Sequence, residues 1–216
     1  MRQAKIKKSR RENILSCFER LVAQKGVNNA TIRDIAKTMD LSIGTVYNEF
    51  KDKRELVATL LSQVIDDFLI SLIREEDKAK RIDDKLYVLT VTRIKLMNSF
   101  RKNNESLFDY LLSEPKHIRY IGKMFLSKRN NINAVILSRL ENVLTRAQRE
   151  NLINVDDVPE TARIFLDAFA EYTAPQEANA LSIKERERYA KAMYDLMIFS
   201  LMMKGTKSMV PEPVLR

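Results

Sequence analysis

The side chains most often used in nucleophilic and metal chemistry are scarce in this sequence. It contains one cysteine, Cys17, and one histidine, His117, among 216 residues. One cysteine cannot form an intramolecular disulfide, and one residue of each type cannot supply a zinc site built from Cys/His clusters. A serine or cysteine hydrolase would have to use His117 as its imidazole base. The single Gly-Lys pair, Gly122-Lys123, lacks the earlier glycine of a phosphate-binding loop, because His117 stands there. We therefore expect no catalytic site, no metal and no cofactor.

Two adjacent acids, Asp156 and Asp157, are the remaining candidates for acid–base catalysis. Neighbouring residues on a helix point in different directions, so the two carboxylates would diverge rather than act as a pair. Asp157 with Pro159 fits a helix start better, the aspartate being the cap. Two alternative functions stay open at this point: an all-helical enzyme with a basic N-terminus, and a helical interaction protein.

Positive charge is concentrated near the N-terminus. The formal net charge is +9, and the first 60 residues hold 13 Lys or Arg against 7 Asp or Glu. The first eleven residues contain no acid and six bases: Arg2, Lys5, Lys7, Lys8, Arg10 and Arg11. Such an arm is either a solvated tail or a segment that follows a polyanion and gains affinity by releasing counterions.

The composition predicts an all-helical chain. Only 4 Gly and 5 Pro occur, too few for β-sandwiches or propellers, which need turn residues about every 8–12 positions. Four helix starts follow from capping residues: Ser9 with Glu12, Thr31 with Asp34, Ser42, and Asp52 with Glu55. Gly26 supplies the stop of the first helix. The longest apolar run, near residues 196–203, is shorter than the roughly 20 residues of a membrane span, so we expect a cytoplasmic protein that does not enter the membrane.

The second and third predicted helices are short and lie about three residues apart, which is the arrangement of a helix-turn-helix. Ala36 faces the third helix, where a larger side chain would hold the two helices apart. Val46, ten residues later, fills the gap between them. An ordinary three-helix bundle stays the alternative, since many helical hairpins have a small residue at such a position.

The segment TIRDIAKTMDLSIGTVYNEFKDKRELV, which begins at Thr31, resembles the N-terminal domain of the TetR family of bacterial transcriptional regulators. The matching residues are Gly26, Thr31, Ile35, Ala36, Ser42, Gly44, Thr45, Val46, Tyr47, Phe50, Lys53 and Leu56. The chain departs from the family pattern at Asp40 in the turn, at Ile43 and at Glu49. Aspartate tolerates the left-handed conformation that glycine usually adopts in this turn. The departures therefore affect the base preference rather than the expected fold.

The resemblance implies a DNA-binding surface in which the third helix enters the major groove. Ser42 and Thr45 can bond to phosphates or base edges. Ile43 can pack on a thymine methyl group, and Asn48 can bind adenine through its amide. Gly44 lets the backbone come close to the DNA.

Further contacts are implied outside that helix start. By resemblance, Tyr47 and Lys53 bind backbone phosphates, and the free N–H groups at the start of the fourth helix suit an anion. Thr31 and Arg33 are expected to add phosphate contacts from the second helix. Glu49 is expected to point away from the DNA or to accept from a cytosine amine, while Val46 and Phe50 are expected in the core.

Residues 1–51 are predicted to form the helix-turn-helix DNA-binding domain with its basic arm, and residues 52–216 a helical effector-binding and dimerisation domain. Beyond the DNA-binding domain, helical periodicity predicts these segments: 52–75, 82–101, 104–113, 117–127, 129–149, 158–174 and 183–204. The last two segments carry apolar residues on more than one face. They could be central buried helices. The resemblance favours instead a four-helix interface with a second copy of the chain, so we expect a homodimer through 158–174 and 183–204.

The resemblance also implies a pocket for an unknown small-molecule effector in the middle of the chain. The candidate lining residues are Arg93, Phe100, Tyr110, His117, Phe125 and Phe169. Most of the aromatic residues are expected in the core. Arg93 stands in the apolar stretch YVLTVTRIKLM, where it either faces solvent or is a buried partner for an anionic ligand. The expected function is that of a ligand-responsive repressor, which binds a palindromic DNA operator as a homodimer and changes the spacing of its recognition helices when the effector binds.

Overall fold

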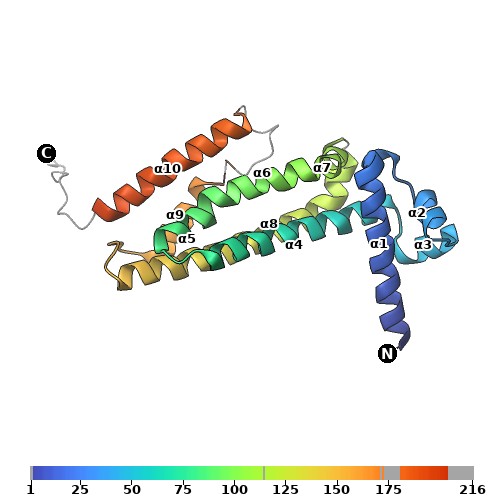
Figure 1. Ribbon diagram of the computed structural model, residues 1–216, viewed down its shortest axis with the longest axis horizontal. Helices are drawn as coiled ribbons and strands as arrows, with labels where there is room; N and C mark the ends of the chain where they lie inside the picture. The colour runs from blue at the N-terminus through green and yellow to red at the C-terminus, as the bar shows by residue number, and fades with distance from the viewer. Residues whose placement is uncertain (1, 114, 171, 173–180, 204–216) are drawn as a thin grey trace. The chain divides into compact units, whose positions relative to one another are not determined.

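The computed structural model describes residues 2–113, 115–170, 172 and 181–203. Within these ranges every regular element is helical, which confirms the all-α expectation. The elements in chain order (Figure 1) are α1 Arg2–Asn29, α2 Ile32–Thr38, α3 Ile43–Glu49, α4 Lys53–Lys78, α5 Ile82–Tyr87, the π-helix η1 Val88–Thr92, α6 Arg93–Asn103, α7 Glu105–Leu112, α8 Pro115–Arg149, α9 Val158–Ala168 and α10 Ile183–Met203.

The chain divides into two compact units. Unit 1 comprises Met1–Phe68 and Phe100–Asn130, and unit 2 comprises Leu69–Ser99 and Asn131–Arg216. The boundaries between the units fall inside α4, α6 and α8. This division by packing differs from the predicted functional boundary at residue 51, because α1–α3 share one core with later helices of unit 1.

Backbone conformation ends the first helical stretch where the sequence predicts. Gly26 has φ 75° and ψ 162° inside α1, a conformation that is open almost only to glycine. The start of α1 differs from the prediction, since the helix begins at Arg2 rather than at Ser9. The basic segment therefore continues the helix at its N-terminal end, and the Ser9 pattern does not begin it.

Side-chain caps set the starts of α2 and α3. Asp34 N–H donates to Thr31 Oγ1 at 3.2 Å, and Thr31 N–H donates to Asp34 Oδ2 at 2.8 Å, which completes the predicted capping box. Ser42 Oγ accepts from Thr45 N–H at 3.0 Å at the start of α3. Asp40, in the turn between the two helices, has φ 51°. The turn thus uses the left-handed conformation expected for this aspartate.

Unit 1 has one apolar core. Its buried residues are Ile14, Leu15, Cys17, Phe18, Val22, Val27, Ala30, Ile35, Ala36, Val46, Phe50, Leu56, Val57, Leu60, Leu61, Val64, Leu107, Tyr110, Leu111 and Ile121. Ala36 and Val46 both belong to this core, and α2 packs against α3. Burial of apolar surface on this scale is the main stabilising contribution to such a unit.

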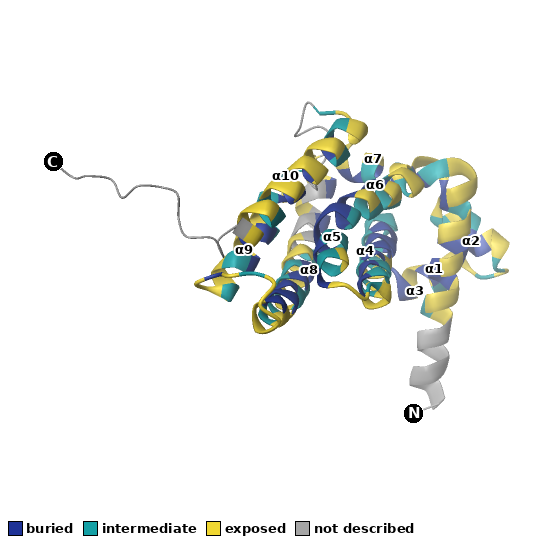
Figure 2. Ribbon diagram, turned by 60° about the vertical axis from the view of Figure 1, so that its left-hand side comes forward, coloured by how far each residue is buried: buried dark blue, intermediate teal, exposed yellow. Residues whose placement is uncertain are grey.

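One described helix, α4, is long and apolar enough to cross a membrane by length and composition alone. Two observations favour a core helix of a folded unit instead. Leu56, Val57, Leu60 and Leu61 of α4 are buried in the core of unit 1, as the buried stripe of the helix in Figure 2 shows. Asp66, in the middle of the apolar stretch, is exposed and forms an ion pair with Lys128.

Unit 2 is built around the end of α4, α5, η1, the start of α6, the end of α8, α9 and α10. Its buried residues include Leu86, Leu89, Val91, Ile94, Leu140, Leu144, Phe165, Phe169 and Ala190. α10 packs against η1, and Tyr194 of α10 donates from its hydroxyl to the Asp83 carbonyl at 2.7 Å. The Tyr194 ring also meets the ring of Tyr87 edge-on, with 5.1 Å between the centroids.

Two expectations about the helices of the C-terminal half need revision. Segments 117–127 and 129–149 form a single helix, α8, because neither glycine nor proline stands near residue 128 to break it. α9 ends at Ala168, with Phe169 as its C-cap, rather than near residue 174.

The start of α9 is as predicted. Asp157 is its N-cap and accepts from Glu160 N–H at 2.8 Å, whereas Asp156 is exposed. This cap accounts for one of the two acids considered for catalysis.

Candidate DNA-binding surface

α3 buries one face and exposes the other. Val46 and Phe50, the residue that caps its C-terminal end, lie in the core, as expected. Ile43, Gly44, Tyr47 and Asn48 are exposed. This exposed face is what remains available for a partner outside the chain.

The start of α3 carries two hydroxyl groups within bonding distance of each other. Ser42 Oγ and Thr45 Oγ1 are 2.8 Å apart, and Ser42 Oγ also accepts the Thr45 N–H. Ser42 is exposed and Thr45 is half-buried. The hydroxyl pair is therefore held by the cap of the helix itself, at the end that reads base edges in helix-turn-helix proteins.

Gly44 has open space around it. A Cβ added there would meet Ser42 Oγ at 3.8 Å, which is ordinary van der Waals contact. The free protein thus gives no steric reason for glycine at this position. The reason implied by the resemblance is a close approach of DNA to the backbone.

The two predicted phosphate contacts on α2 differ in their surroundings. Arg33 is exposed. Thr31 donates its hydroxyl hydrogen to Asp34 Oδ2 at 2.6 Å, so a phosphate contact from this hydroxyl requires that bond to break. The Lys25 ammonium and the hydrogen bonds from Thr31 hold the pKa of Asp34 well below its usual range. Asp34 is therefore ionised and holds the cap at neutral pH.

Lys53, at the start of α4, is half-buried and already has two contacts. Its Nζ donates to the Asn28 carbonyl at 2.9 Å and lies 5.5 Å from the centre of the Tyr110 ring. Burial lowers the pKa of Lys53 below its ordinary value. An ammonium group has three hydrogens, so Lys53 can keep the Asn28 bond and still donate to a phosphate.

Arg11 is an architectural residue that the sequence did not identify. Its guanidinium lies over the Phe50 ring at 3.9 Å, donates to the Glu49 carbonyl, and forms an ion pair with Glu55 at 2.8 Å. Burial favours a higher pKa for Glu55, but the hydrogen bonds from Arg11 and from the Lys51 N–H outweigh it and lower that pKa. Arg11 thus ties α1 to the end of α3 and the start of α4, and is not simply part of a basic arm.

Glu49 points away from the exposed face of α3. Its side chain is buried, and its Oε2 atom has no hydrogen-bond partner among the described residues. The expectation that Glu49 would avoid the DNA side agrees with this placement. The side chains of residues 2–9, which carry four of the six bases of the basic arm, lie outside the described part of the structure.

The residues predicted to line an effector pocket are divided between the two units. Phe100, Tyr110 and His117 are in unit 1, Arg93 and Phe169 are in unit 2, and the side chain of Phe125 lies outside the described residues. In unit 1 the ring of His117 stacks on that of Tyr110 at 4.2 Å, and its Nδ1 is 2.9 Å from the Tyr110 carbonyl. These aromatic groups are packed in the protein interior.

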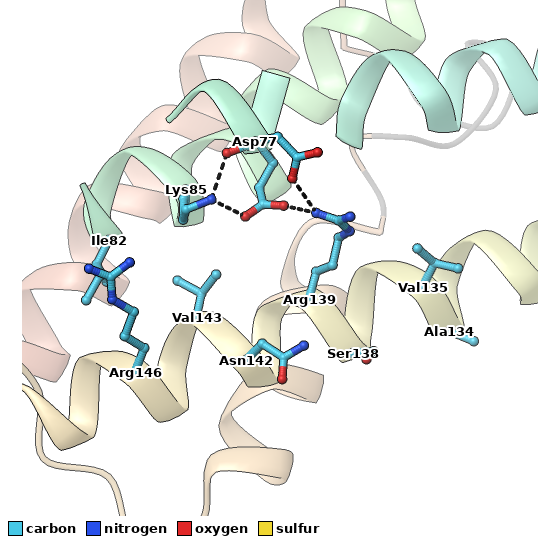
Figure 3. A pocket seen from close by; sticks show the side chains of 11 residues that line it. Asp77, Ile82, Lys85, Ala134, Val135, Ser138, Arg139, Asn142, Val143 and Arg146 are labelled. Carbon is cyan, nitrogen blue, oxygen red and sulfur yellow. Dashed lines mark hydrogen bonds and ion pairs between the residues drawn. The ribbon is translucent and has the colours of Figure 1, made fainter. Parts of the chain in front are cut away.

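A different pocket exists in unit 2, and the sequence did not predict it. The groove has a volume of about 670 Å³ and lies between the end of α4, α5 and α8. Lys85 and Arg139 point to the acidic end of α4 from two different helices (Figure 3), and both bind the buried carboxylate of Glu76. Glu76 itself is only 4% exposed.

Arg93 is buried rather than exposed, so of its two predicted placements only the buried one holds. The residue is 4% exposed, and its Nε atom has no hydrogen-bond partner among the described residues. Burial alone lowers the pKa of Arg93 to about 10. The guanidinium is therefore still charged at neutral pH.

The surface of α10 is apolar along its C-terminal half. Leu196 is 67% exposed, Phe199 62% and Met202 59%, and Figure 2 shows α10 as a largely exposed helix. On α9, Ile164 is exposed as well. Three large apolar side chains exposed within two helical turns are unusual for a helix that faces only water.

Comparison with known proteins agrees with this arrangement. Residues 14–60 match the tetR family of bacterial regulatory proteins. An HTH-type transcriptional regulator of Haemophilus influenzae is 35% identical over 80 residues, 37% of this chain and 42% of that protein. An HTH-type regulator of Staphylococcus aureus is 24% identical over 160 residues, 73% of this chain and 76% of that one. The chain thus spans less than half of the first relative and about three quarters of the second.

Solved structures show the same fold over nearly the whole chain. A TetR-family transcriptional regulator of Pectobacterium atrosepticum superposes with a TM-score of 0.59 at 14% identity, covering 91% of this chain and 96% of that one. The fatty acid degradation regulator FadR of Bacillus halodurans gives a TM-score of 0.51 at 15% identity, over 87% and 94%. The match at residues 14–60, together with the capped helix-turn-helix, identifies the N-terminal domain as one of the TetR family of bacterial transcriptional regulators, and the solved structures show that the chain shares their fold.

Proposed function

We propose that the protein is a repressor that binds a palindromic DNA operator as a homodimer and releases it when a small-molecule effector binds. The observation that supports this most directly is the exposed face of α3, where Ile43, Gly44, Tyr47 and Asn48 surround a helix start capped by Ser42. A helix with a polar exposed start and a buried opposite face suits insertion into the major groove.

The contacts divide into two kinds. Asn48 and Ile43 are the candidates for base recognition, an amide for adenine and an apolar group for the thymine methyl. Tyr47, Lys53, Arg33 and the hydroxyls at the start of α3 bind phosphates and fix the orientation of the helix without reading sequence. Tyr47 is the clearest of these, since its ring is 51% exposed and its hydroxyl has no intramolecular partner among the described residues.

The homodimer is needed because one recognition helix reads too few base pairs to select an operator. Two copies of α3 related by a two-fold axis read two half-sites about 34–36 Å apart, or a multiple of that distance. The exposed apolar groups of α10, together with Ile164 of α9, supply a surface that a second copy can bury. A two-fold interface places the same patch of each copy against the other.

The effector acts by favouring a dimer in which the two recognition helices have the wrong spacing for the operator. A coupling of about 1–3 kcal/mol is typical of such systems and changes the operator affinity roughly 5- to 150-fold. The protein acts in the bacterial cytoplasm, where its DNA lies, and its role requires no catalytic step.

Fluorescence anisotropy with the DNA immediately upstream of the protein's own gene tests the proposal. Labelled DNA is titrated with protein at several salt concentrations, with unrelated DNA as the control. We expect binding at least ~10³-fold tighter than to unrelated DNA, with one dimer or a pair of dimers per site. Equally weak binding to all DNA, lost at modest salt, would mean that the basic N-terminal segment acts alone and that the operator proposal is wrong.

A further inference from the structure

Arg93 is a buried positive charge without a counter-charge among the described residues. It is the first residue of α6, is 4% exposed, and forms no ion pair or side-chain hydrogen bond among the described residues. Arg11 and Arg139 show the usual arrangement in this same protein, since each binds a carboxylate. Arg93 therefore differs from Arg11 and Arg139 in having no carboxylate partner among the described residues.

An unpaired buried guanidinium is costly. Transfer of a charged group from water to a protein interior is strongly unfavourable unless a partner and hydrogen bonds compensate for the lost hydration. Arginine cannot avoid this cost by losing its proton near neutral pH. If this position only needed to be filled, methionine or leucine would be more favourable than arginine. The charge is therefore best explained by a ligand that binds it.

The helical stretch of η1 and α6, which carries Arg93, contains no acid. On its own helical stretch the residues one turn earlier are Leu89 and Thr90, both buried. Thr90 donates its hydroxyl to the Leu86 carbonyl at 2.6 Å. Asn98, five residues further along α6, is also buried.

α10, which packs against η1, adds one more cation and one acid. Arg186 is 1% exposed and donates from Nε to the Leu181 carbonyl at 3.2 Å. The acid beside it, Glu187, accepts from Asn98 Nδ2 at 3.4 Å and forms no ion pair with Arg93. Among the described residues, Arg93 therefore has no carboxylate partner on η1, α6 or α10.

The backbone at this place is also irregular. Val88–Thr92 forms a π-helix directly before Arg93. Single π-turns inside helices are rare and occur frequently at functional sites. The irregular turn and the unpaired guanidinium are independent observations that coincide at consecutive residues.

We propose that Arg93 binds the carboxylate of a small apolar acid, and that this acid is the effector. The inference rests on the proposed effector response and names the chemical class of the effector. One guanidinium offers two parallel N–H bonds to a carboxylate, and the nearby residues Leu89, Val91 and Ile94 are buried apolar groups that add no second cation. This composition suits a monocarboxylate with a hydrocarbon body better than a phosphate-rich metabolite.

The groove between α4, α5 and α8 is a weaker candidate for an anion. Its central cations, Lys85 and Arg139, already bind Glu76, and an entering anion would have to displace that carboxylate. A ligand at Arg93 displaces no acid. It would also act where α10 packs against η1, and α10 is the helix proposed to join the two copies.

Thermal unfolding and binding titrations with three carboxylates test the proposal. The probes are sodium acetate, benzoate and octanoate, with benzyl alcohol and 1-octanol as uncharged counterparts and the ionic strength held constant with sodium chloride. We expect octanoate and benzoate to raise the Tm of the full-length protein in proportion to the logarithm of concentration. We expect acetate to act more weakly and the alcohols not to act through this site.

Three variants separate a ligand site from a structural role. Arg93→Met removes the charge at nearly constant volume. It should keep or raise the Tm without ligand and weaken carboxylate binding at least tenfold. Arg93→Lys keeps the charge but lacks the two parallel N–H donors of the guanidinium, and should bind carboxylates with intermediate affinity. Lys95→Met, which removes an exposed cation two residues further along α6, is the matched control and should leave binding unchanged.

Operator binding is measured in parallel, so that the two proposals can fail separately. Carboxylate binding that depends on Arg93 without release of the operator would support the site and contradict its effector role. Carboxylate binding by a protein that binds no operator would support the site and contradict the proposed function. The site is wrong if no carboxylate changes the Tm, if Arg93→Met binds as the wild type does, or if Arg93→Met unfolds and Arg93→Lys binds normally.

Discussion

α3 and α10 both expose side chains that are not part of the core. The two exposed surfaces differ in chemistry. α3 presents Tyr47, Asn48 and a hydroxyl cap beside the single apolar Ile43. α10 presents Leu196, Phe199 and Met202, all more than half exposed. Hydrogen-bonding groups with one apolar contact suit the edges of DNA bases. An apolar row suits a second protein surface that excludes water.

Exposure alone therefore does not identify the partner of a helix. Each helix has one buried face that fixes it in its own unit: Val46 anchors α3, and Ala190 and Tyr194 anchor α10. The residues left outside are free to differ. Four predictions test this contrast between the surfaces of α3 and α10. If one of them fails, the role assigned to the helix concerned is wrong.

The largest expected effect concerns the apolar row of α10. The double substitution Leu196→Glu with Phe199→Glu places two charges where a second copy should bury apolar surface, so the dimer should dissociate. Sedimentation should show monomers, and operator affinity should fall by ~10³ or more, because specific binding then rests on a single half-site. Lys184→Glu, an exposed change on the same helix, is the control. A dimer that survives the double substitution would place the interface elsewhere.

The second prediction concerns two exposed tyrosines, one on each helix. Tyr47→Phe should lower operator affinity about tenfold or more, because a hydrogen bond to a charged group contributes about 1.5–3 kcal/mol. Tyr189→Phe on α10 removes the same hydroxyl from another exposed ring and should leave operator affinity unchanged. Anisotropy titrations measure both. Equal effects of the two substitutions would contradict a specific contact from α3.

The third prediction compares two glycines of the DNA-binding region. Gly26→Ala should cost about 1–3 kcal/mol of stability, because alanine is strained at φ 75°. Gly44→Ala should leave the stability equal or raise it by up to about 1 kcal/mol, since the added Cβ meets only Ser42 Oγ at 3.8 Å. Urea denaturation measures both stabilities.

Operator binding adds a second readout for Gly44. The alanine variant should bind the operator more weakly despite its undiminished stability, because its Cβ stands between the backbone and the DNA. Wild-type affinity would show that the DNA does not approach α3 at this residue.

The smallest expected effect is a pH dependence of stability that the DNA-binding region and α10 share. Asp34 caps α2 and Glu185 caps α10 in the same way, through boxes with Thr31 and Ser182. The Lys25 ammonium and Thr31 lower the pKa of Asp34, and the hydrogen bonds from Ser182 lower that of Glu185. A lowered carboxylate pKa gives stability that is present above the ordinary value near 4 and is lost as the pH falls below it.

Urea midpoints between pH 6 and about 3 test this expectation. The wild type should weaken as the pH falls through this range. Asp34→Asn and Glu185→Gln should each lower the midpoint at pH 6 and reduce its dependence on pH, by small amounts because both carboxylates are at the surface. An unchanged pH dependence in either variant would show that its capping box contributes little.

The sequence alone determined the local features of the fold. Thr31, Ser42 and Asp157 were predicted as caps, Gly26 as a stop and Asp40 as a left-handed turn residue, and each has that role. The physical reason is that capping and backbone strain depend on residues within about four positions of one another. The family pattern followed from the same short segment.

Only the tertiary structure decided which side chains are buried and what they meet. Arg11 joins α1 to Glu55 across 44 positions of sequence, and Glu76 is buried under Lys85 and Arg139. Arg93 lies in the interior of unit 2 without an ion-pair partner among the described residues. The local sequence around a charged residue does not show whether its side chain lies in solvent or in the interior. Its burial depends on distant helices that pack over it, and no local spacing encodes those helices.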